Sequence, residues 1–193
     1  MTEIDVETVL RAQKGDQDAS RKIIEALHRP VLATIYRFLG PRWSGEIEDV
    51  AQDVFLKVFR AIDRFEPERN VKFSTWVYTF VRNHCFDLTK RRRISTRSLS
   101  GEDGDGLQEL PGGGPPPSMQ AENQELGMQI ERAIAKLNED QRMVFILREY
   151  QGLDYAQIAE VMGISEGTVK SRLHRAKEAL RDRLAPYLRS TQA

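Results

Sequence analysis

Three groups of side chains in this 193-residue sequence could do chemistry: the adjacent His84 and Cys85, scattered hydroxyl and acidic residues, and clusters of Lys and Arg. Neighbours on a helix point about 100° apart, so His84 and Cys85 cannot act together as base and nucleophile, and no third group orients them. We therefore expect both to be core residues. No glycine-rich phosphate loop, catalytic triad or Cys/His cluster is apparent, so we predict no enzyme, no cofactor and no metal site.

The basic clusters indicate a different chemistry, the binding of nucleic acid. Lys and Arg balance Asp and Glu, 29 against 29, so the formal net charge is zero. The charge is nevertheless local: five cations between residues 86 and 100 oppose only Asp87, and seven between 165 and 189 oppose three acidic residues. Local positive charge in a neutral chain is typical of a DNA reader rather than of a polycation that coats nucleic acid.

The sequence also indicates the cellular compartment in which the protein acts. Cys85 is the only cysteine, which excludes an intramolecular disulfide and favours a reducing environment. The acidic and polar N-terminus does not resemble a signal peptide, and no apolar run approaches the roughly 20 residues that span a bilayer. We expect a cytoplasmic protein that is not inserted in a membrane.

Helical periodicity on both sides of a Gly/Pro-rich stretch sets the expected architecture. We predict an all-α fold of two small helical domains, residues 1–95 and 122–193, joined by a flexible linker over 96–121. The linker stretch lacks the bulky apolar residues that a core needs, and no strand pattern is apparent elsewhere.

Within the first block, the clearest helix spans about 46–62. Its apolar residues recur at steps of three and four and form one buried stripe. The opposite face carries Asp49, Asp53, Leu56 and Arg60. An ordinary solvated face is the plain interpretation, but an apolar Leu56 in its middle favours a partner surface.

A second helix is expected from about Ser74 to Lys90. Its outward face combines aromatic, amide and basic groups, the types that stack on bases, read their edges and hold phosphates: Trp76, Thr79, Arg82, Asn83, Phe86 and Lys90. The alternative, in which Trp76 and Phe86 pack against another helix, stays open at this point.

The second block contains a helix-turn-helix pattern. Asn138 and Asp154 are each followed three residues later by Gln, as at a helix start, and Gly163 fits the left-handed position that ends a helix. Ser165 then caps a helix whose stripe would dock on its neighbours: Val169, Leu173, Ala176 and Leu180. Lys170, Ser171, His174 and Arg175 would face a major groove, with Ser165 on a phosphate. The alternative is a helical hairpin with a charged face.

Three segments resemble the extracytoplasmic-function (ECF, group 4) sigma factors of the sigma-70 family. EDVAQDVFLKVFRAIDRF (48–65) is similar to regions 2.1–2.2, and FSTWVYTFVRNHCFDLTKRRR (73–93) is similar to regions 2.3–2.4. LNEDQRMVFILREYQGLDYAQIAEVMGISEGTVKSRLHRAKEAL (137–180) resembles region 4. A helix-turn-helix alone is common, whereas both regions in this order in one short chain are specific.

The resemblance implies a transcription initiation factor that reads −10 and −35 promoter elements, with partners and site residues as follows. Core RNA polymerase would be bound through its β′ clamp coiled coil by Asp49, Gln52, Asp53, Leu56 and Arg60. The −10 element would be melted and read by the 63–72 loop and by Phe73, Ser74, Trp76, Arg82, Asn83, Arg91, Arg92 and Arg93. The −35 element would be read by Ser165, Thr168, Lys170, Ser171, Arg172, His174 and Arg175, in a region that also contacts the β flap.

Two other functions would fit parts of this sequence. A conventional operator-binding regulator would use the helix-turn-helix but would not need the two outward faces of the first block. An antagonist or adaptor would bind polymerase without reading DNA. The family resemblance also implies an anti-sigma factor as a partner, although nothing in the sequence identifies one.

Overall fold

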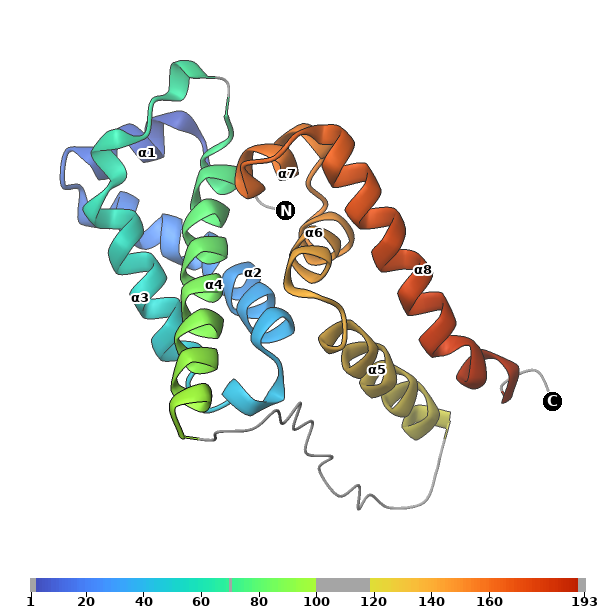
Figure 1. Ribbon diagram of the computed structural model, residues 1–193. Helices are drawn as coiled ribbons and strands as arrows, with labels where there is room; N and C mark the ends of the chain where they lie inside the picture. Colours follow the sequence, from blue (N-terminus) through green and yellow to red (C-terminus); the bar gives the residue numbers. More distant parts are fainter. Residues whose placement is uncertain (1–2, 70, 100–118, 191–193) are drawn as a thin grey trace.

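The structure is a computed structural model that describes residues 3–69, 71–99 and 119–190. The described part of the chain is all helical (Figure 1), which confirms the predicted all-α class. Its elements are α1 (Val6–Gln13), α2 (Gln17–Leu39), η1 (Pro41–Trp43), α3 (Ile47–Arg60), η2 (Ile62–Arg64), η3 (Pro67–Arg69), α4 (Phe73–Leu99), α5 (Met119–Ala135), α6 (Glu139–Glu149), α7 (Tyr155–Met162) and α8 (Glu166–Ser190).

Helices α1 to α4 form the first domain around one apolar core. Asp5 and Asp16 cap the starts of α1 and α2, each accepting backbone N–H bonds from the first turn. The α3 stripe is buried as its periodicity predicted: Ile47, Val50, Ala51, Val54, Phe55 and Val58. Facing it, α2 buries residues spaced three and four apart, so the two amphipathic helices cover each other's apolar sides.

Helix α4 is longer than predicted. It was expected to end near Lys90, but it continues to Leu99. The basic run Arg91–Arg93 has good helix propensity, and neither Gly nor Pro interrupts the chain before Gly101. The exposed basic residues Arg91–Arg93 therefore lie within α4.

Helices α5 to α8 form the second domain, and its helix-turn-helix is confirmed in detail. The Asp154 side chain accepts from Gln157 N at 2.8 Å while the Gln157 side chain accepts from Asp154 N at 3.0 Å, a complete capping box at the start of α7. Gly163 ends α7 with φ 65° and ψ 40°, and the Ser165 hydroxyl accepts from Thr168 N at 3.2 Å at the start of α8.

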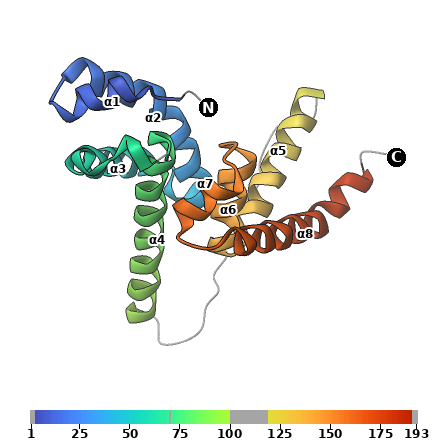
Figure 2. The same cartoon turned by 90° about the horizontal axis from the view of Figure 1, so that it is seen from above.

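The two domains pack against each other. Helix α7 lies against α4, and α5 and α6 lie against α2, as both views show (Figures 1 and 2). Tyr78 of α4 is fully buried there, and its hydroxyl donates to Gln151 Oε1 at 2.7 Å. This domain interface was not predicted.

Of the predicted linker 96–121, residues 96–99 belong to α4 and 119–121 to α5, and 100–118 lie outside the described residues.

Candidate nucleic-acid interface

The outer side of α3 presents the predicted mixed surface. Its predicted residues are all exposed, and we call them the α3 face: Asp49, Gln52, Asp53, Leu56 and Arg60. Leu56 exposes 54% of its surface and borders a hollow of about 350 Å³ whose apolar walls include Ile24, Phe55 and Phe59. An exposed leucine beside an apolar hollow and between charges is the pattern of a docking surface with a central anchor.

His84 lies directly beneath this face and is nearly buried. One ring nitrogen contacts Lys57 Nζ, and the other lies 3.6 Å from Asp53 Oδ2. Burial and the neighbouring Lys57 charge lower the pKa of His84, which disfavours the charged form of the ring. Cys85 is completely buried, and burial raises the pKa of its thiol, so it stays protonated and unreactive. Both are core residues, as predicted.

The start of α4 carries an aromatic cluster. Trp76 lies 5.5 Å from Phe65, 5.6 Å from Phe73 and 4.7 Å from Phe80, measured between ring centroids. Trp76 keeps part of its surface exposed, whereas Phe73 and Ser74 are only 3% and 1% exposed. Phe73 and Ser74 are therefore packed in the core, and in this conformation they have almost no surface that DNA could contact.

Further along α4, Asn83 is exposed and Arg82 is half-buried. Arg82 Nη1 donates to Asn83 Oδ1 at 2.7 Å, and its guanidinium lies 4.8 Å from the centre of the Phe86 ring. Arg91, Arg92 and Arg93 are all exposed. Phe86 was expected to face outward, but it stacks on Phe38 of α2 at 5.2 Å, so the packing alternative holds for this residue.

The first turns of α8 present the predicted reading surface. We call its exposed members the α8 face: Ser165, Lys170, Ser171, His174 and Arg175. Thr168 and Arg172 are half-buried, and the Arg172 guanidinium lies 3.0 Å from Asp140 Oδ2. On the opposite side the expected stripe, Val169, Leu173, Ala176 and Leu180, docks into the core. The Ser165 cap, the turn at Gly163 and the buried apolar stripe together fix the orientation of α8, so that its basic side chains point outward.

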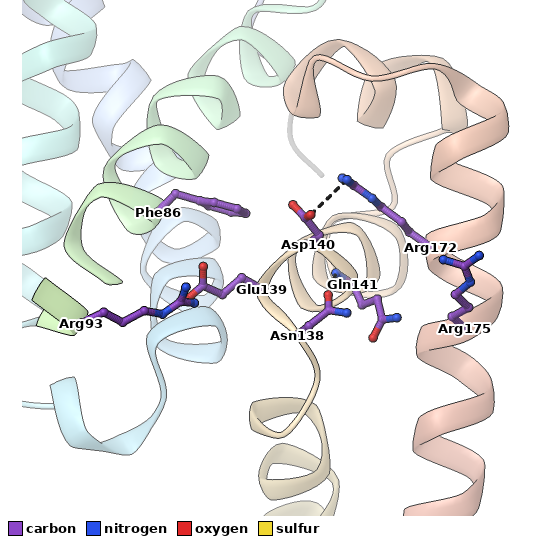
Figure 3. Close-up of a pocket in the computed structure, with 8 residues that line it drawn as sticks. All are labelled: Phe86, Arg93, Asn138, Glu139, Asp140, Gln141, Arg172 and Arg175. Carbon is purple, nitrogen blue, oxygen red and sulfur yellow. Dashed lines mark hydrogen bonds and ion pairs between the residues drawn. The ribbon is translucent and has the colours of Figure 1, made fainter. Parts of the chain in front are cut away.

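A pocket of about 420 Å³ brings predicted residues of both domains together (Figure 3). Phe86 and Arg93 enter it from α4, and Arg172 and Arg175 enter from α8. The first turn of α6 lies between them, where Glu139 pairs with Arg93 while Asp140 pairs with Arg172. Two of the predicted DNA contacts are thus neutralised by neighbouring carboxylates in this arrangement.

These acidic partners were missed in the sequence, as was Arg142. Glu139 and Asp140 follow the Asn138 cap and look like ordinary first-turn acids that favour the helix start. Arg142 donates to the carbonyls of Ile134, Ala135 and Leu137, and across the domain interface to Phe38 O at 2.7 Å. Periodicity carries no signal for such contacts, because it reports which face is apolar and not what lies opposite.

Comparison with known proteins identifies the family. The model of the family described as "Sigma-70 region 2" matches residues 23–94, and that of "Sigma-70, region 4" matches residues 127–180. The ECF RNA polymerase sigma-E factor of Escherichia coli strain K12 is 33% identical over 189 residues, which cover 94% of each chain. The chain belongs to the ECF sigma factors of the sigma-70 family.

Further relatives of this sigma factor support the same family assignment. The ECF RNA polymerase sigma factor SigW of Bacillus subtilis strain 168 is 32% identical over 180 residues, 91% of this chain and 94% of the relative. The structure of CnrH in complex with the cytosolic domain of CnrY has a TM-score of 0.66 at 25% identity, covering 93% of this chain and 96% of that one. The sigma factor RpoE in complex with the anti-sigma factor NepR from Bartonella quintana shares the fold, with a TM-score of 0.66 at 22% identity over 86% and 96%.

The function follows from the family. This sigma factor directs promoter-specific transcription initiation by RNA polymerase, and the operator-binding regulator is disfavoured because both sigma regions are present. Sigma factors are initiation factors and not enzymes. In the described ranges, no helix combines the length and apolar character needed to cross a bilayer.

Proposed function

We propose that the two domains divide the work as the predicted boundaries suggest. Residues 1–95 act as region 2, which binds core polymerase and opens the −10 element, and residues 122–193 act as region 4, which reads the −35 element. Residues 96–121 connect them. One observation supports this division: the first domain exposes two mixed or basic faces, the α3 face and outer α4, and the second domain exposes the α8 face.

Polymerase binding is assigned to the α3 face. Its exposed Leu56 and the apolar hollow beside it supply an anchor for a partner helix, and the surrounding Asp49, Asp53 and Arg60 supply charges that fix the register. The β′ clamp coiled coil is the proposed partner there, and the β flap is the proposed partner of region 4.

DNA reading is assigned to α4 and α8. Trp76 has a partly exposed ring beside the 63–72 loop, which suits capture of a base flipped out of the −10 element. Arg82 and Asn83 offer donors to base edges, and Arg91, Arg92 and Arg93 hold the backbone. Phe73 and Ser74 would act in this set by packing behind the loop. On α8 the face from Ser165 to Arg175, including Thr168 and Arg172, enters the major groove of the −35 element.

An anti-sigma factor is a further proposed partner. The similar CnrH structure is a complex with the cytosolic domain of CnrY, and the similar RpoE structure is a complex with the anti-sigma factor NepR. We expect this chain to act in the cytoplasm, where its polymerase is, and to carry no catalytic centre of its own.

The free chain is expected to bind promoter DNA poorly. The −35 and −10 elements are about 25 base pairs apart by position, or about 85 Å at about 3.4 Å per base pair. In the packed arrangement Arg93 and Arg175 line the same pocket, so they cannot reach both elements. Fluorescence anisotropy of a labelled promoter at physiological salt should give a Kd of about micromolar or weaker without core polymerase. A nanomolar, sequence-specific Kd for the free chain would contradict this expectation.

The deciding experiment is transcription of fragmented genomic DNA by core polymerase with and without this protein. Starts that appear only with the protein and share paired −35 and −10 elements would support the proposal. A folded, core-bound chain that starts no transcripts would favour the antagonist or adaptor.

The α8 face has its own test. Changing Lys170 and Arg175 together to Ala is expected to lower transcription from a −35-dependent promoter by about tenfold or more, because each good base contact is worth about 1–3 kcal/mol. Both side chains are exposed, so folding should be unaffected. Arg181→Ala, exposed on the same helix beyond the proposed groove contact, is the matched control. Unchanged promoter choice in the double variant would remove the α8 face from the proposal.

A further inference from the structure

A polar contact from α1 holds the start of the segment that connects α3 to α4. Gln13, the last residue of α1, donates from its single Nε2 to Ile62 O and to Phe65 O, at 2.9 Å each. A primary amide has two N–H bonds, and both are used here on two carbonyls three residues apart. Helix α1 thereby fixes the backbone where the 63–72 loop begins.

The amide is itself held in a defined place. Val9 and Ala12 bury the inner side of α1 in the core, and Arg11 pairs with Asp16 at 2.6 Å across the turn into α2. Gln13 is half-buried between these anchors and the loop. Because its helix cannot shift freely, the position of its Nε2 fixes the position of both carbonyls.

The carbonyl of Phe65 is the point where the loop leaves the core. The Phe65 ring is buried and lies 5.1 Å from Phe73 and 5.5 Å from Trp76 between centroids. Beyond it the chain is held at its far end by a pair between Lys72 and Glu3 at 3.1 Å, both well exposed. An exposed pair of this kind contributes little, so of these two polar contacts the Gln13 contact is the stronger.

We propose that Gln13 is a positioning residue for base capture at the −10 element. It does not touch DNA; it sets the direction in which the chain leaves Phe65 beside Trp76, and so the surface that would accept the flipped base. This inference rests on the proposed −10 role of the loop. Recognition sites need their groups held to within about 0.5 Å, so a loosened loop should cost selectivity before it costs folding.

The test replaces Gln13 by Glu, which has the same shape but turns two donors into a carboxylate that repels both carbonyls. Gln17→Glu, the same change at a nearby exposed glutamine, is the control. Full-length protein with core polymerase is given promoters with each of the four bases at the captured −10 position, and 2-aminopurine at that position reports base flipping. We expect Gln13→Glu to lower the flipping signal and the preference for the best base by about tenfold, with core affinity unchanged.

The possible results distinguish the positioning role of Gln13 from the −10 role of the 63–72 loop on which it rests. Normal base preference and flipping in Gln13→Glu would overturn the positioning role. If the unchanged protein shows no base preference at −10, the proposed role of the loop itself fails. Gln13→Met, which keeps the length but has no donor and no charge, guards against a folding defect in the Glu variant. A well-folded Met variant should show the same loss of base preference, and wild-type preference in it would equally overturn the inference.

Discussion

Leu56→Asp is expected to abolish the binding of this sigma factor to core polymerase and, with it, transcription. Leu56 is the exposed apolar centre of the α3 face, beside the hollow lined by Ile24, Phe55 and Phe59. Burying a leucine contributes about 1.5–3 kcal/mol, and an unpaired carboxylate in an interface adds its own desolvation penalty. The combined loss of about 3 kcal/mol or more corresponds to about a hundredfold or greater rise in Kd.

The measurement is a titration of labelled core polymerase with the variant, together with its thermal unfolding. Because Leu56 is exposed in the free chain, the free energy of unfolding should change by less than about 0.5 kcal/mol. Val6→Asp is the matched control, since Val6 is 50% exposed but lies on α1. Wild-type affinity in Leu56→Asp would mean that polymerase docks elsewhere.

Among the substitutions proposed for this protein, Arg142→Met should lower the free energy of unfolding the most. The Arg142 guanidinium binds four backbone carbonyls, three at the end of α5 and in the turn after it, and the fourth, Phe38 O, at the end of α2. Burial lowers its pKa, but an arginine remains charged at neutral pH. Methionine fills similar volume without a donor, so these carbonyls lose their partner.

Each charge-assisted bond is worth about 1.5–3 kcal/mol, and several of the freed carbonyls can turn to water, so we expect a net loss of about 3 kcal/mol. For a chain of this size that lowers Tm by about 6–12 °C. Calorimetry measures the change, and Arg181→Met, at a side chain 72% exposed, is the control. An unchanged Tm would show that water replaces the guanidinium without cost.

The domain interface is a second readout of the same variant. Arg142 joins α6 to the end of α2, and the Tyr78–Gln151 bond and the Arg37–Glu131 pair at 3.1 Å also cross the interface. Weakening it should increase the average distance between fluorophores placed on α3 and α8. A variant with a lower Tm but an unchanged distance would assign the effect of Arg142 to the second domain alone.

Local features of this protein were predictable because they depend on neighbours in the chain. The α3 stripe, the capping box of Asp154 and Gln157, and the left-handed Gly163 are each decided by residues within about one or two helical turns. The exposure of Leu56 and of Arg175 followed from the same periodicity. The family resemblance then supplied functions for faces that periodicity had already located.

The tertiary structure decided what lies opposite each face. Phe86 was expected outward, yet Phe38, 48 positions away in the sequence, stacks on it. Folding also brings Ile62 and Phe65 to Gln13, and it places Asp140 beside Arg172. Periodicity specifies that a side is apolar or polar, whereas the partner of that side depends on loop lengths and packing across the whole chain. The domain interface is therefore a property of the fold and not of any segment.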